Sequence, residues 1–395
     1  MADEPTTDAG ILLVCGEPSG DLHASELVAE LRRLIPVRVV AAGGSRLAAA
    51  GAEVRWDSTN WGAIGLPEAL RKLPLYWSKM AELVRAAEEL RPALLLLVDF
   101  GAFNLRLAAR VRRRHPALPV FYYFPPSSWD RQRRYYGKML QFTDYVATPF
   151  PWNAAQLAAQ GATARWIGHP AVDRVRPAED KAAAKAEVGA DPDTVVLALL
   201  PGSRKLERNL LGETFLRAAE ELRRRLGRVE VLWSSLQGFE KTDWGLGVGA
   251  RRIWARPVQD TAALLRAADL GFCSFGTVTL EAALAGVPVV TAYRGTLAMK
   301  LVYRFMDIPT RHYSMPNIIV GEAILPEVLG DEATPERLVE EGLALLKDEE
   351  RRERVAQAYA KVREKLGPPG AARRAAEMVV KALEGRLRPH RRPLG

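Results

Sequence analysis

The sequence predicts an α/β protein built from two doubly wound halves that face a cleft. The 395 residues exceed what a single core usually holds, which favours two domains. Short apolar runs alternate with longer amphipathic runs, as strands and helices do around parallel sheets. This alternation occurs in two series of similar size. Ligands of such sheets bind beyond the carboxyl ends of the strands, so the loops at those ends are the first place to look for function.

The first half shows strand-like runs separated by helical runs. Strands are expected at Ile11–Cys15, Val37–Ala42, Ala93–Val98, Val120–Phe124, Tyr145–Thr148 and Arg165–Ile167. Helices are expected at Ala24–Leu34, Leu75–Leu90 and Leu105–Arg114. Gly168–Ala178, which combines prolines with charged residues, is the expected linker. The first domain is therefore placed at residues 9–172.

The second half repeats the pattern. Strands are expected at Thr194–Leu200, Val229–Ser234, Arg251–Ala255, Leu270–Ser274 and Val287–Tyr293. Helices are expected at Leu211–Leu226, Thr261–Ala268 and Thr279–Leu284, followed by a charged helical tail, Thr334–Leu383, with Pro335 in its first turn. We place the second domain at residues 173–350 and terminal helices at 351–385. Those helices are expected to pack back on the first domain or against a second copy of the chain, as in a homodimer.

The charge balance narrows the class of partner. A formal net charge of +9 favours anionic partners such as phosphates, nucleic acid or an acidic membrane face. Nucleic acid is disfavoured, because the cations are spread along amphipathic helices without a recognition module. Cys15 and Cys273 lie in apolar runs and are expected to be buried thiols. The polar start does not resemble a secretory signal, and no apolar run approaches the ~18 residues of a membrane span. A cytoplasmic protein with at most peripheral membrane contact is expected.

A glycine-containing turn follows the first strand, Gly16-Glu17-Pro18-Ser19-Gly20-Asp21-Leu22-His23. Glycine and serine allow a sharp turn that leaves room for a ligand, and Asp21 could cap the next helix. A tight turn without a ligand is the alternative. The spacing differs from the G-x-G-x-x-G fingerprint of nicotinamide dinucleotide sites.

Asp99 ends the aliphatic run Ala93–Val98. A carboxylate at the carboxyl end of a central strand points into the cleft, where partial burial would raise its pKa and suit it to general-base work. Either Asp99 or Asn104 could instead cap the helix Leu105–Arg114. The spacing favours Asn104 for that cap, which leaves Asp99 for chemistry. His23, in the first turn, is a weaker rival base.

Two turns in the second half are typical of phosphate-binding loops. Leu199–Lys205 contains Pro201-Gly202-Ser203-Arg204, where a guanidinium could bind a diphosphate through two parallel N–H bonds. Its spacing is not that of a P-loop, which disfavours ATP hydrolysis. Gly276-Thr277 opens a helix whose free N–H groups attract phosphate. Glu281, about one turn further on, could accept hydrogen bonds from ribose hydroxyls or simply complement the helix dipole.

In the order and spacing of these motifs the sequence resembles the lipid-A-disaccharide synthases, inverting glycosyltransferases that join two acylated glucosamine units. The resemblance extends roughly from Ile11 to Glu327. Besides the turns above, it includes Asp99 with Phe103-Asn104, Pro126-Ser127 with Trp129, Ile167-Gly168-His169-Pro170 with Asp173, Arg204 with Glu207, Leu280-Glu281, Tyr293-Arg294, and Ser314 with Pro316-Asn317.

The resemblance implies a GT-B fold with two Rossmann-like domains, a UDP-2,3-diacylglucosamine donor, a lipid X acceptor, no metal ion or other cofactor, and work at the inner face of the cytoplasmic membrane. It implies that Asp99 is the base. The residues expected to bind the UDP-sugar are Gly202, Ser203, Arg204, Gly276, Thr277, Glu281 and Asn317. The residues expected to bind the acceptor are Ser19, Gly20, Asp21, Asn104, Ser127 and Trp129.

Departures from the family pattern fall mainly in the first half, which should face the acceptor. The family's D-A-P-D-F-N is here D-F-G-A-F-N from Asp99, so that Ala102 replaces a second acidic residue. The family's S-P-S-V-W-A-W loses one tryptophan in Pro125–Arg131, and Ser234–Gly249 also differs. A relative acting on another lipid-linked or amino sugar is therefore an alternative.

The stretch Trp56–Met80 mixes aromatic residues with cations, which suits a surface that dips into lipid headgroups. Packing on the core is the alternative. Arg110–His115 and Arg131–Arg134 add positive charge that could face anionic lipid or an acceptor phosphate.

Two alternative functions would need diphosphate-binding loops of the same kind. One is a UDP-N-acetylglucosamine 2-epimerase-like enzyme, which would need no apolar acceptor entrance. The other is a non-catalytic nucleotide-sugar-binding protein, which the presence of Asp99, Arg204 and Glu281 disfavours.

Overall fold

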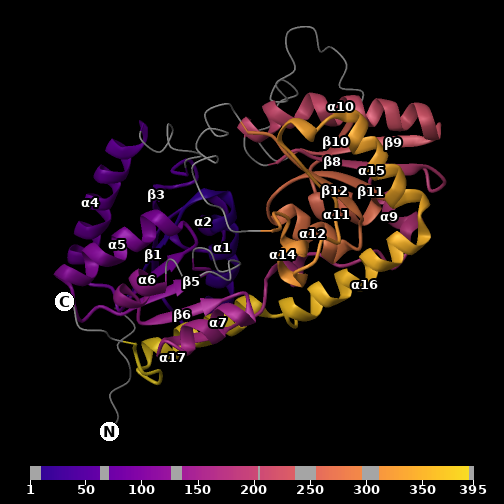
Figure 1. Cartoon of the computed structure of the whole chain (residues 1–395). Coiled ribbons are helices and arrows are strands. Elements are labelled where there is room, and N and C mark those ends of the chain that lie inside the picture. The colour runs from indigo at the N-terminus through magenta and orange to yellow at the C-terminus, as the bar shows by residue number, and fades with distance from the viewer. Residues whose placement is uncertain are drawn as a thin grey trace. The chain divides into compact units, whose positions relative to one another are not determined.

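The protein divides into two compact units, described here from a computed structural model. Unit 1 comprises residues 1–170 and 366–395, and unit 2 comprises residues 171–365. The structure describes residues 10–62, 71–125, 136–202, 205–235, 255–295 and 311–390. Figure 1 shows that each unit is a sheet flanked by helices.

Unit 1 contains a parallel sheet of seven strands in the order β3-β2-β1-β4-β5-β6-β7. The strands are β1 (Ile11–Cys15), β2 (Val39–Gly43), β3 (Glu53–Asp57), β4 (Leu94–Val98), β5 (Val120–Tyr123), β6 (Tyr145–Thr148) and β7 (Thr163–Trp166). The expected doubly wound half is confirmed, because the chain builds outward from β1 in both directions. Strand β3 was not predicted. It is an edge strand with charged residues at alternate positions, so it has little of the apolar character used to predict strands.

The helices of unit 1 cover both faces of its sheet. They are α1 (Glu17–Leu34), α2 (Ser45–Ala49), α4 (Leu73–Leu90), α5 (Gly101–Arg114), α6 (Tyr136–Phe142), α7 (Pro151–Ala158) and α17 (Ala371–Leu383). Leu13 and Cys15 of β1 belong to a core cluster shared with α1 and α17, whereas Leu12 and Val14 belong to a second cluster shared with α4 and α5. Alternate strand residues thus supply two cores, which explains the uninterrupted apolar runs.

Helix α17 belongs to unit 1 although it lies near the end of the chain. It packs against α1, and Figure 1 shows it among the elements of that unit. The Arg374 guanidinium donates hydrogen bonds to the carbonyl oxygens of Ile167, Pro368 and Pro369. Helix α17 is therefore part of the packing of unit 1.

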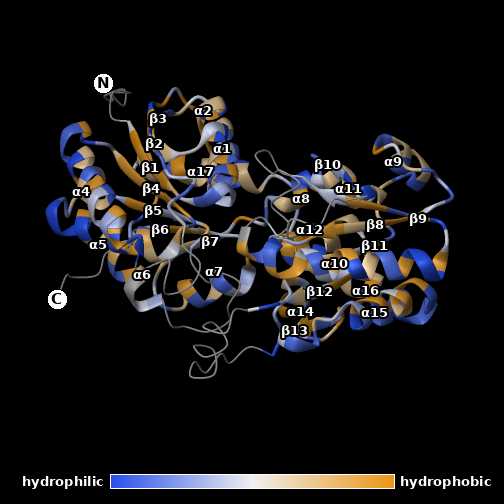
Figure 2. Ribbon diagram, turned by 90° about the horizontal axis from the view of Figure 1, so that it is seen from above, coloured by the Kyte–Doolittle hydropathy of each residue, from blue (hydrophilic) through white to orange (hydrophobic). Residues whose placement is uncertain are grey.

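Unit 2 contains a parallel sheet of six strands in the order β10-β9-β8-β11-β12-β13. The strands are β8 (Val195–Leu200), β9 (Val229–Ser234), β10 (Arg256–Val258), β11 (Leu270–Ser274), β12 (Val289–Tyr293) and β13 (Glu327–Leu329). The helices are α8 (Ala171–Arg174), α9 (Lys181–Glu187), α10 (Lys205–Leu226), α11 (Thr261–Ala267), α12 (Thr277–Ala285), α14 (Met315–Val320), the 3-10 turn η2 (Gly330–Glu332), α15 (Pro335–Lys347) and α16 (Glu349–Leu366). Figure 2 shows hydrophobic strands inside each unit and helices with hydrophilic outer surfaces.

Side-chain caps mark the starts of α9, α11 and α15 in unit 2. The helix α15 begins with Pro335 in its first turn, as expected, and the Thr334 hydroxyl caps it by accepting the Arg337 N–H. Residues 251–254 of the strand expected at Arg251–Ala255 lie outside the described part, and the strand β10 follows directly after that range, at Arg256–Val258. The three-residue β13 was not predicted, because so short a strand has no periodicity.

Among the described helices, none combines the length and the apolar character needed to cross a bilayer.

Candidate functional site

The turn after β1 is short, because α1 already begins at Glu17, with Pro18 in its first turn. Ser19, Gly20, Asp21 and His23 therefore lie on a helix and not in an open loop. A Cβ added to Gly20 would lie 3.8 Å from the Asp99 Cβ, an ordinary van der Waals contact, so this part of α1 lies close to the end of β4. The structure thus places Gly20 beside Asp99.

Asp21 caps a helix, but not the one that carries it. Its carboxylate accepts hydrogen bonds from the backbone N–H groups of Gly44, at 2.6 Å, and of Arg46 and Leu47 at the start of α2. The expectation that Asp21 caps the helix following it is therefore wrong, because a residue inside the first turns of α1 turns its side chain toward α2. The side chain is 4% exposed, which favours a structural role over acceptor contact.

His23 is a buried ring in an aromatic cluster. Its imidazole stacks on Phe124 with ring centroids 4.2 Å apart, and His169 meets it edge-on at 6.3 Å. A side chain that is 4% exposed and stacked in this way has little access to a substrate hydroxyl. These contacts favour Asp99 over His23 as the base.

Asp99 sits at a strained turn after β4. Its φ is 49° and that of Phe100 is 51°, two successive non-glycine residues in the left-handed region. Each such residue costs on the order of 1 kcal/mol or more, and strain of this kind concentrates at functional sites. The Asp99 N–H donates to Tyr123 O at 3.0 Å, and the Asp99 main-chain oxygen accepts the Tyr122 hydroxyl at 2.8 Å.

The Tyr122 phenol strengthens this turn. Burial raises the pKa of Tyr122 well above its usual value, and the negative charge of Asp99 raises it further. The hydroxyl therefore remains protonated and keeps donating to the Asp99 main chain. The half-buried Asp99 side chain lies at the carboxyl end of β4, where ligands of parallel sheets bind.

Asn104 does not cap α5. That helix begins at Gly101, with Phe100 at its N-cap, so Asn104 lies in the first turn, and the expected cap is wrong. The Asn104 side-chain amide instead donates to the main-chain oxygens of Asp99 at 2.9 Å, Val98 at 3.2 Å and Val14 at 3.3 Å. Asn104 is fully buried. Its hydrogen bonds link the ends of β1 and β4 and hold the main chain of Asp99 in place.

Ser127 and Trp129, expected to bind the acceptor, lie outside the described residues, as does Arg131–Arg134. Within Arg110–His115, Arg112 does not face a ligand. Its guanidinium is buried and pairs with the Asp144 carboxylate, which also accepts the Val120 N–H at 2.8 Å.

In unit 2, Gly202 follows β8 in a turn that only glycine suits. Its φ is 109°, and an added Cβ would lie 2.2 Å from Glu207 Oε2 and 2.9 Å from Ser274 Oγ. The turn after β8 therefore lies close to the end of β11. Ser203 and Arg204, which follow Gly202, lie outside the described residues.

Ser274 was not predicted as a site residue. It is 2% exposed, and among the described residues its hydroxyl has no hydrogen-bond partner. A buried hydroxyl is normally satisfied, so this one is suited to donate to a ligand oxygen. Its position at the end of β11, directly before the Gly-Thr turn, could have indicated this role.

The second turn opens α12. Gly276 has a φ of 142° and precedes the helix, and both Gly276 and Thr277 are exposed. The Thr279 hydroxyl donates to Gly276 O at 2.8 Å. This bond links the residue before the helix to the first turn of α12. The first N–H groups of a helix have no partner within it, so this exposed end attracts an anion.

Glu281 lies within α12, half-buried. Burial raises the pKa of its carboxyl, and Arg174 partly offsets that increase. A carboxyl with a raised pKa beside an anion-binding helix end is a candidate for substrate contact, although burial alone also perturbs structural groups.

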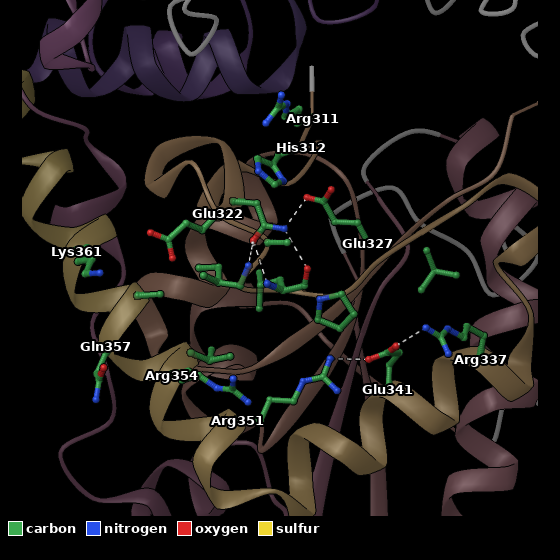
Figure 3. A pocket seen from close by; sticks show the side chains of 18 of the residues that line it. Arg311, His312, Glu322, Glu327, Arg337, Glu341, Arg351, Arg354, Gln357 and Lys361 are labelled. Atoms are coloured by element: carbon green, nitrogen blue, oxygen red, sulfur yellow. Dashed lines mark hydrogen bonds and ion pairs between the residues drawn. The ribbon is translucent and has the colours of Figure 1, made fainter. Parts of the chain in front are cut away.

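Asn317 is fully engaged by the protein. Its side-chain oxygen accepts the N–H groups of Ile324 and Leu325, and its amide donates to Leu325 O and to Glu327 Oε1 at 2.9 Å. Figure 3 marks the bond to the Glu327 carboxylate with a dashed line. The buried Asn317 side chain shapes the segment around α14 through these bonds, and its contact with UDP stays a prediction.

Glu327, another residue that was not predicted as a site residue, organises the same segment. Its carboxylate accepts the N–H groups of Tyr313, at 3.1 Å, and Ser314, at 2.7 Å, as well as the Ser314 hydroxyl. These bonds fix the start of α14. No local signal in the sequence marks a glutamate as the partner of residues that precede it by more than ten positions.

A pocket of about 710 Å³ adjoins β13, α15 and α16. Glu341 in its wall pairs with Arg337 and Arg351, so much of its charge is matched within the protein. Of the predicted site residues in the described part, Asn317 lines it, whereas Gly276, Thr277 and Glu281 do not. The pocket is therefore distinct from the helix end that attracts an anion.

Within the described ranges, no cluster of three or more histidine, cysteine, aspartate or glutamate residues is arranged to hold a metal ion.

Known structures resemble the chain in architecture. A putative UDP-N-acetylglucosamine 2-epimerase from Listeria monocytogenes superimposes with a TM-score of 0.65 at 15% identity, covering 98% of this chain and 100% of that one. The calicheamicin glycosyltransferase CalG4 superimposes with a TM-score of 0.59 at 18% identity, covering 96% and 99%. The expected GT-B fold is confirmed, and likeness at this level of identity concerns the fold alone.

Sequence comparison is more specific. The chain matches the family described as lipid-A-disaccharide synthetase over residues 11–382. It is 34% identical to the lipid-A-disaccharide synthase of Prochlorococcus marinus over 384 residues, covering 94% of this chain and 98% of that one. It is also 34% identical to that of Nitrosococcus oceani over 377 residues, covering 95% and 96%. The chain therefore belongs to the lipid-A-disaccharide synthase family of glycosyltransferases.

Proposed function

We propose that the protein transfers 2,3-diacylglucosamine from its UDP-linked donor to a lipid X-like acceptor, forming a disaccharide and releasing UDP. The observation that carries the proposal is the Asp99 turn, whose strained backbone is held by hydrogen bonds from Asn104 and Tyr122. A protein maintains such strain where a side chain must be presented in one orientation.

The chemistry divides between the two units. The Asp99 carboxylate of unit 1 takes the proton from the attacking acceptor hydroxyl. The resulting oxygen forms a bond to the anomeric carbon on the face opposite the diphosphate. The bond from that carbon to the diphosphate oxygen breaks, its electron pair leaves with UDP, and the configuration at the anomeric carbon is inverted.

Unit 2 stabilises the leaving UDP. The N-terminal N–H groups of α12 and the Ser274 hydroxyl face the diphosphate, and Glu281 accepts from the ribose hydroxyls. Arg204, two positions after Gly202 in the sequence, adds a guanidinium charge. Preorganised donors of this kind stabilise the charge that develops on a leaving group, so we expect activity without an added divalent cation.

The test uses purified protein, radiolabelled UDP-2,3-diacylglucosamine and lipid X in detergent. The proposal expects acceptor-dependent UDP release together with a labelled disaccharide. A labelled epimer formed without acceptor would instead indicate a 2-epimerase. Donor binding without any product would indicate a nucleotide-sugar-binding protein.

Peripheral contact with an anionic membrane is part of the proposal. Leu73, Leu75 and Trp77 at the start of α4 are 43%, 36% and 65% exposed, and the Arg110 guanidinium lies 5.2 Å from the Trp77 ring centroid. Exposed apolar side chains beside a cation suit the headgroup region of a lipid surface. In contrast, Trp61 and Tyr76 of the same stretch pack around Phe103, so only part of the stretch is available.

Vesicle sedimentation tests this contact. Leu75→Ser with Trp77→Ser should reduce binding to phosphatidylglycerol vesicles severalfold, and phosphatidylcholine vesicles should bind less of either protein. Trp166→Ser, which changes a side chain 40% exposed on β7, is the matched control. An equal loss of vesicle binding in the control would show that the protein adheres through any exposed aromatic residue and that the start of α4 is no specific membrane surface. The state of association, predicted as a possible homodimer, is measured by light scattering.

A further inference from the structure

Three aromatic rings form a stack in unit 2 that the proposed reaction has not used. Phe275 follows β11, Tyr293 ends β12 and Tyr313 precedes α14. The Phe275 ring lies 6.1 Å from that of Tyr293, at an interplanar angle of 21°, and 5.7 Å from that of Tyr313, at 24°. Phe275 and Tyr293 are half-buried and Tyr313 is 38% exposed, so the stack keeps an accessible apolar surface.

The stack adjoins the anion-binding end of α12. Phe275 directly precedes Gly276, the residue that opens this helix. Tyr313 is held in place through its backbone, because its N–H and that of Ser314 both donate to the Glu327 carboxylate. The rings therefore form a fixed surface beside the position proposed for the diphosphate.

The orientation of α12 shows which end of the donor the stack would meet. The Met315 N–H donates to Thr279 Oγ1 at 3.3 Å, so Thr279 faces α14. Glu281 follows two residues later, about 200° around the helix axis, and therefore faces away from α14. A donor whose ribose is held by Glu281 and whose diphosphate caps α12 extends its other end toward α14. That is the side on which Tyr313 lies.

We propose that Phe275, Tyr293 and Tyr313 bind the acylated sugar of the donor, with the rings packed on the sugar and on the first methylene groups of its acyl chains. Aromatic side chains bury large apolar areas at little cost in conformational entropy, which suits a ligand that carries hydrocarbon. This inference rests on the proposed function, because it takes the position of UDP from Glu281 and α12.

Binding of the uracil ring to the stack is the alternative arrangement. The position of Glu281 on the far side of α12 from α14 argues against that, and the two arrangements differ in a measurable way. If the stack bound uracil, removing a ring would raise the Kd of UDP itself. If it bound the acylated sugar, removing a ring would raise only the Kd of the complete donor.

Equilibrium titration with two probes, UDP and UDP-2,3-diacylglucosamine, tests the inference. Phe275→Ala and Tyr313→Ala should raise the Kd of the diacyl donor by roughly tenfold, the loss expected for removing one stacked aromatic contact. The Kd of UDP should change less than twofold. Tyr313→Phe keeps the ring and should bind the diacyl donor at least fivefold more tightly than Tyr313→Ala. Trp166→Ala, in unit 1, is the control for loss of an exposed aromatic residue.

Equal weakening of both probes would overturn the inference in favour of uracil binding, and no weakening of either would overturn it outright. If Phe275→Ala does not fold, the Tyr313→Ala and Tyr313→Phe variants, at an exposed position, provide the test. Because titration needs no turnover, its result is separable from the proposed reaction. A selective loss of diacyl-donor binding in a protein that makes no disaccharide would support the subsite and reject the transfer.

Discussion

Asn104 donates its buried side-chain amide to the main-chain oxygen of Asp99 at 2.9 Å. The same amide reaches the oxygens of Val98 and Val14, so one side chain joins the ends of two central strands beneath the proposed base. The backbone of Asp99 is therefore held in place at the carboxyl end of β4.

Asp99→Asn should abolish most transfer while leaving UDP bound. The amide keeps the size of the side chain but cannot take a proton, and loss of a general base typically costs 10²–10⁴-fold in rate. Steady-state transfer and UDP titration measure the two effects separately. Asp193→Asn, an exposed position, is the control. A substantial rate in Asp99→Asn would remove Asp99 from the mechanism.

Asn104→Ala should lower both stability and kcat. The substitution leaves buried carbonyl oxygens without their donor, which costs about 1–3 kcal/mol in the free energy of unfolding. Urea denaturation measures that loss. The Kd of UDP, bound by unit 2, should stay within twofold of wild type. Wild-type kcat in the folded variant would show that Asn104 does not position Asp99.

Gly202→Ala should weaken UDP binding and destabilise the protein more than Gly227→Ala does. Both residues have positive φ, 109° and 79°, but a Cβ on Gly202 would meet Glu207 Oε2 at 2.2 Å, whereas one on Gly227 meets nothing within 4 Å. The control thus carries the backbone strain, about 1 kcal/mol, without the clash. Thermal unfolding and UDP titration compare the two, and equal effects would contradict a crowded phosphate turn.

UDP binding should depend on pH through Glu281. Burial raises its pKa, with Arg174 partly opposing, so the carboxyl takes up a proton at a higher pH than an ordinary glutamate. The carboxylate that accepts from ribose hydroxyls is present above that pKa and is lost as the pH falls through it. UDP affinity should therefore decrease on acidification. Glu281→Gln should remove this component and leave the part due to titration of UDP, and identical pH profiles would exclude Glu281 from the site.

Arg112→Met should cost about 3–5 kcal/mol in the free energy of unfolding, because it leaves the buried Asp144 carboxylate without its cation. Arg112→Met with Asp144→Asn should recover part of the loss. Arg217→Ala breaks an exposed pair with Glu213 and should cost less than about 1 kcal/mol. Urea denaturation of the three variants measures these differences. A small loss in Arg112→Met would mean that water or another group satisfies Asp144.

The positions of glycine and carboxylate residues near strand ends could be predicted from the sequence. Asp99 after an aliphatic run and Gly276 before a helix are local patterns, and both lie at the carboxyl ends of strands as expected. The partners of Asp21 and Asn317 could not be predicted. Asp21 bonds to residues more than twenty positions away, and the four bonds of Asn317 depend on how β13 returns beside α14.

The sequence by itself determined the two doubly wound halves, the turns that suit a nucleotide diphosphate and membership of the family, because apolar periodicity, glycine placement and motif order are properties of neighbouring residues. Tertiary structure alone decided that Asn104 supports Asp99, that Glu327 fixes the start of α14, and that α17 packs on α1. Hydrogen bonds and packing join whichever groups the folded chain brings together. Distance along the sequence carries no information about those pairs.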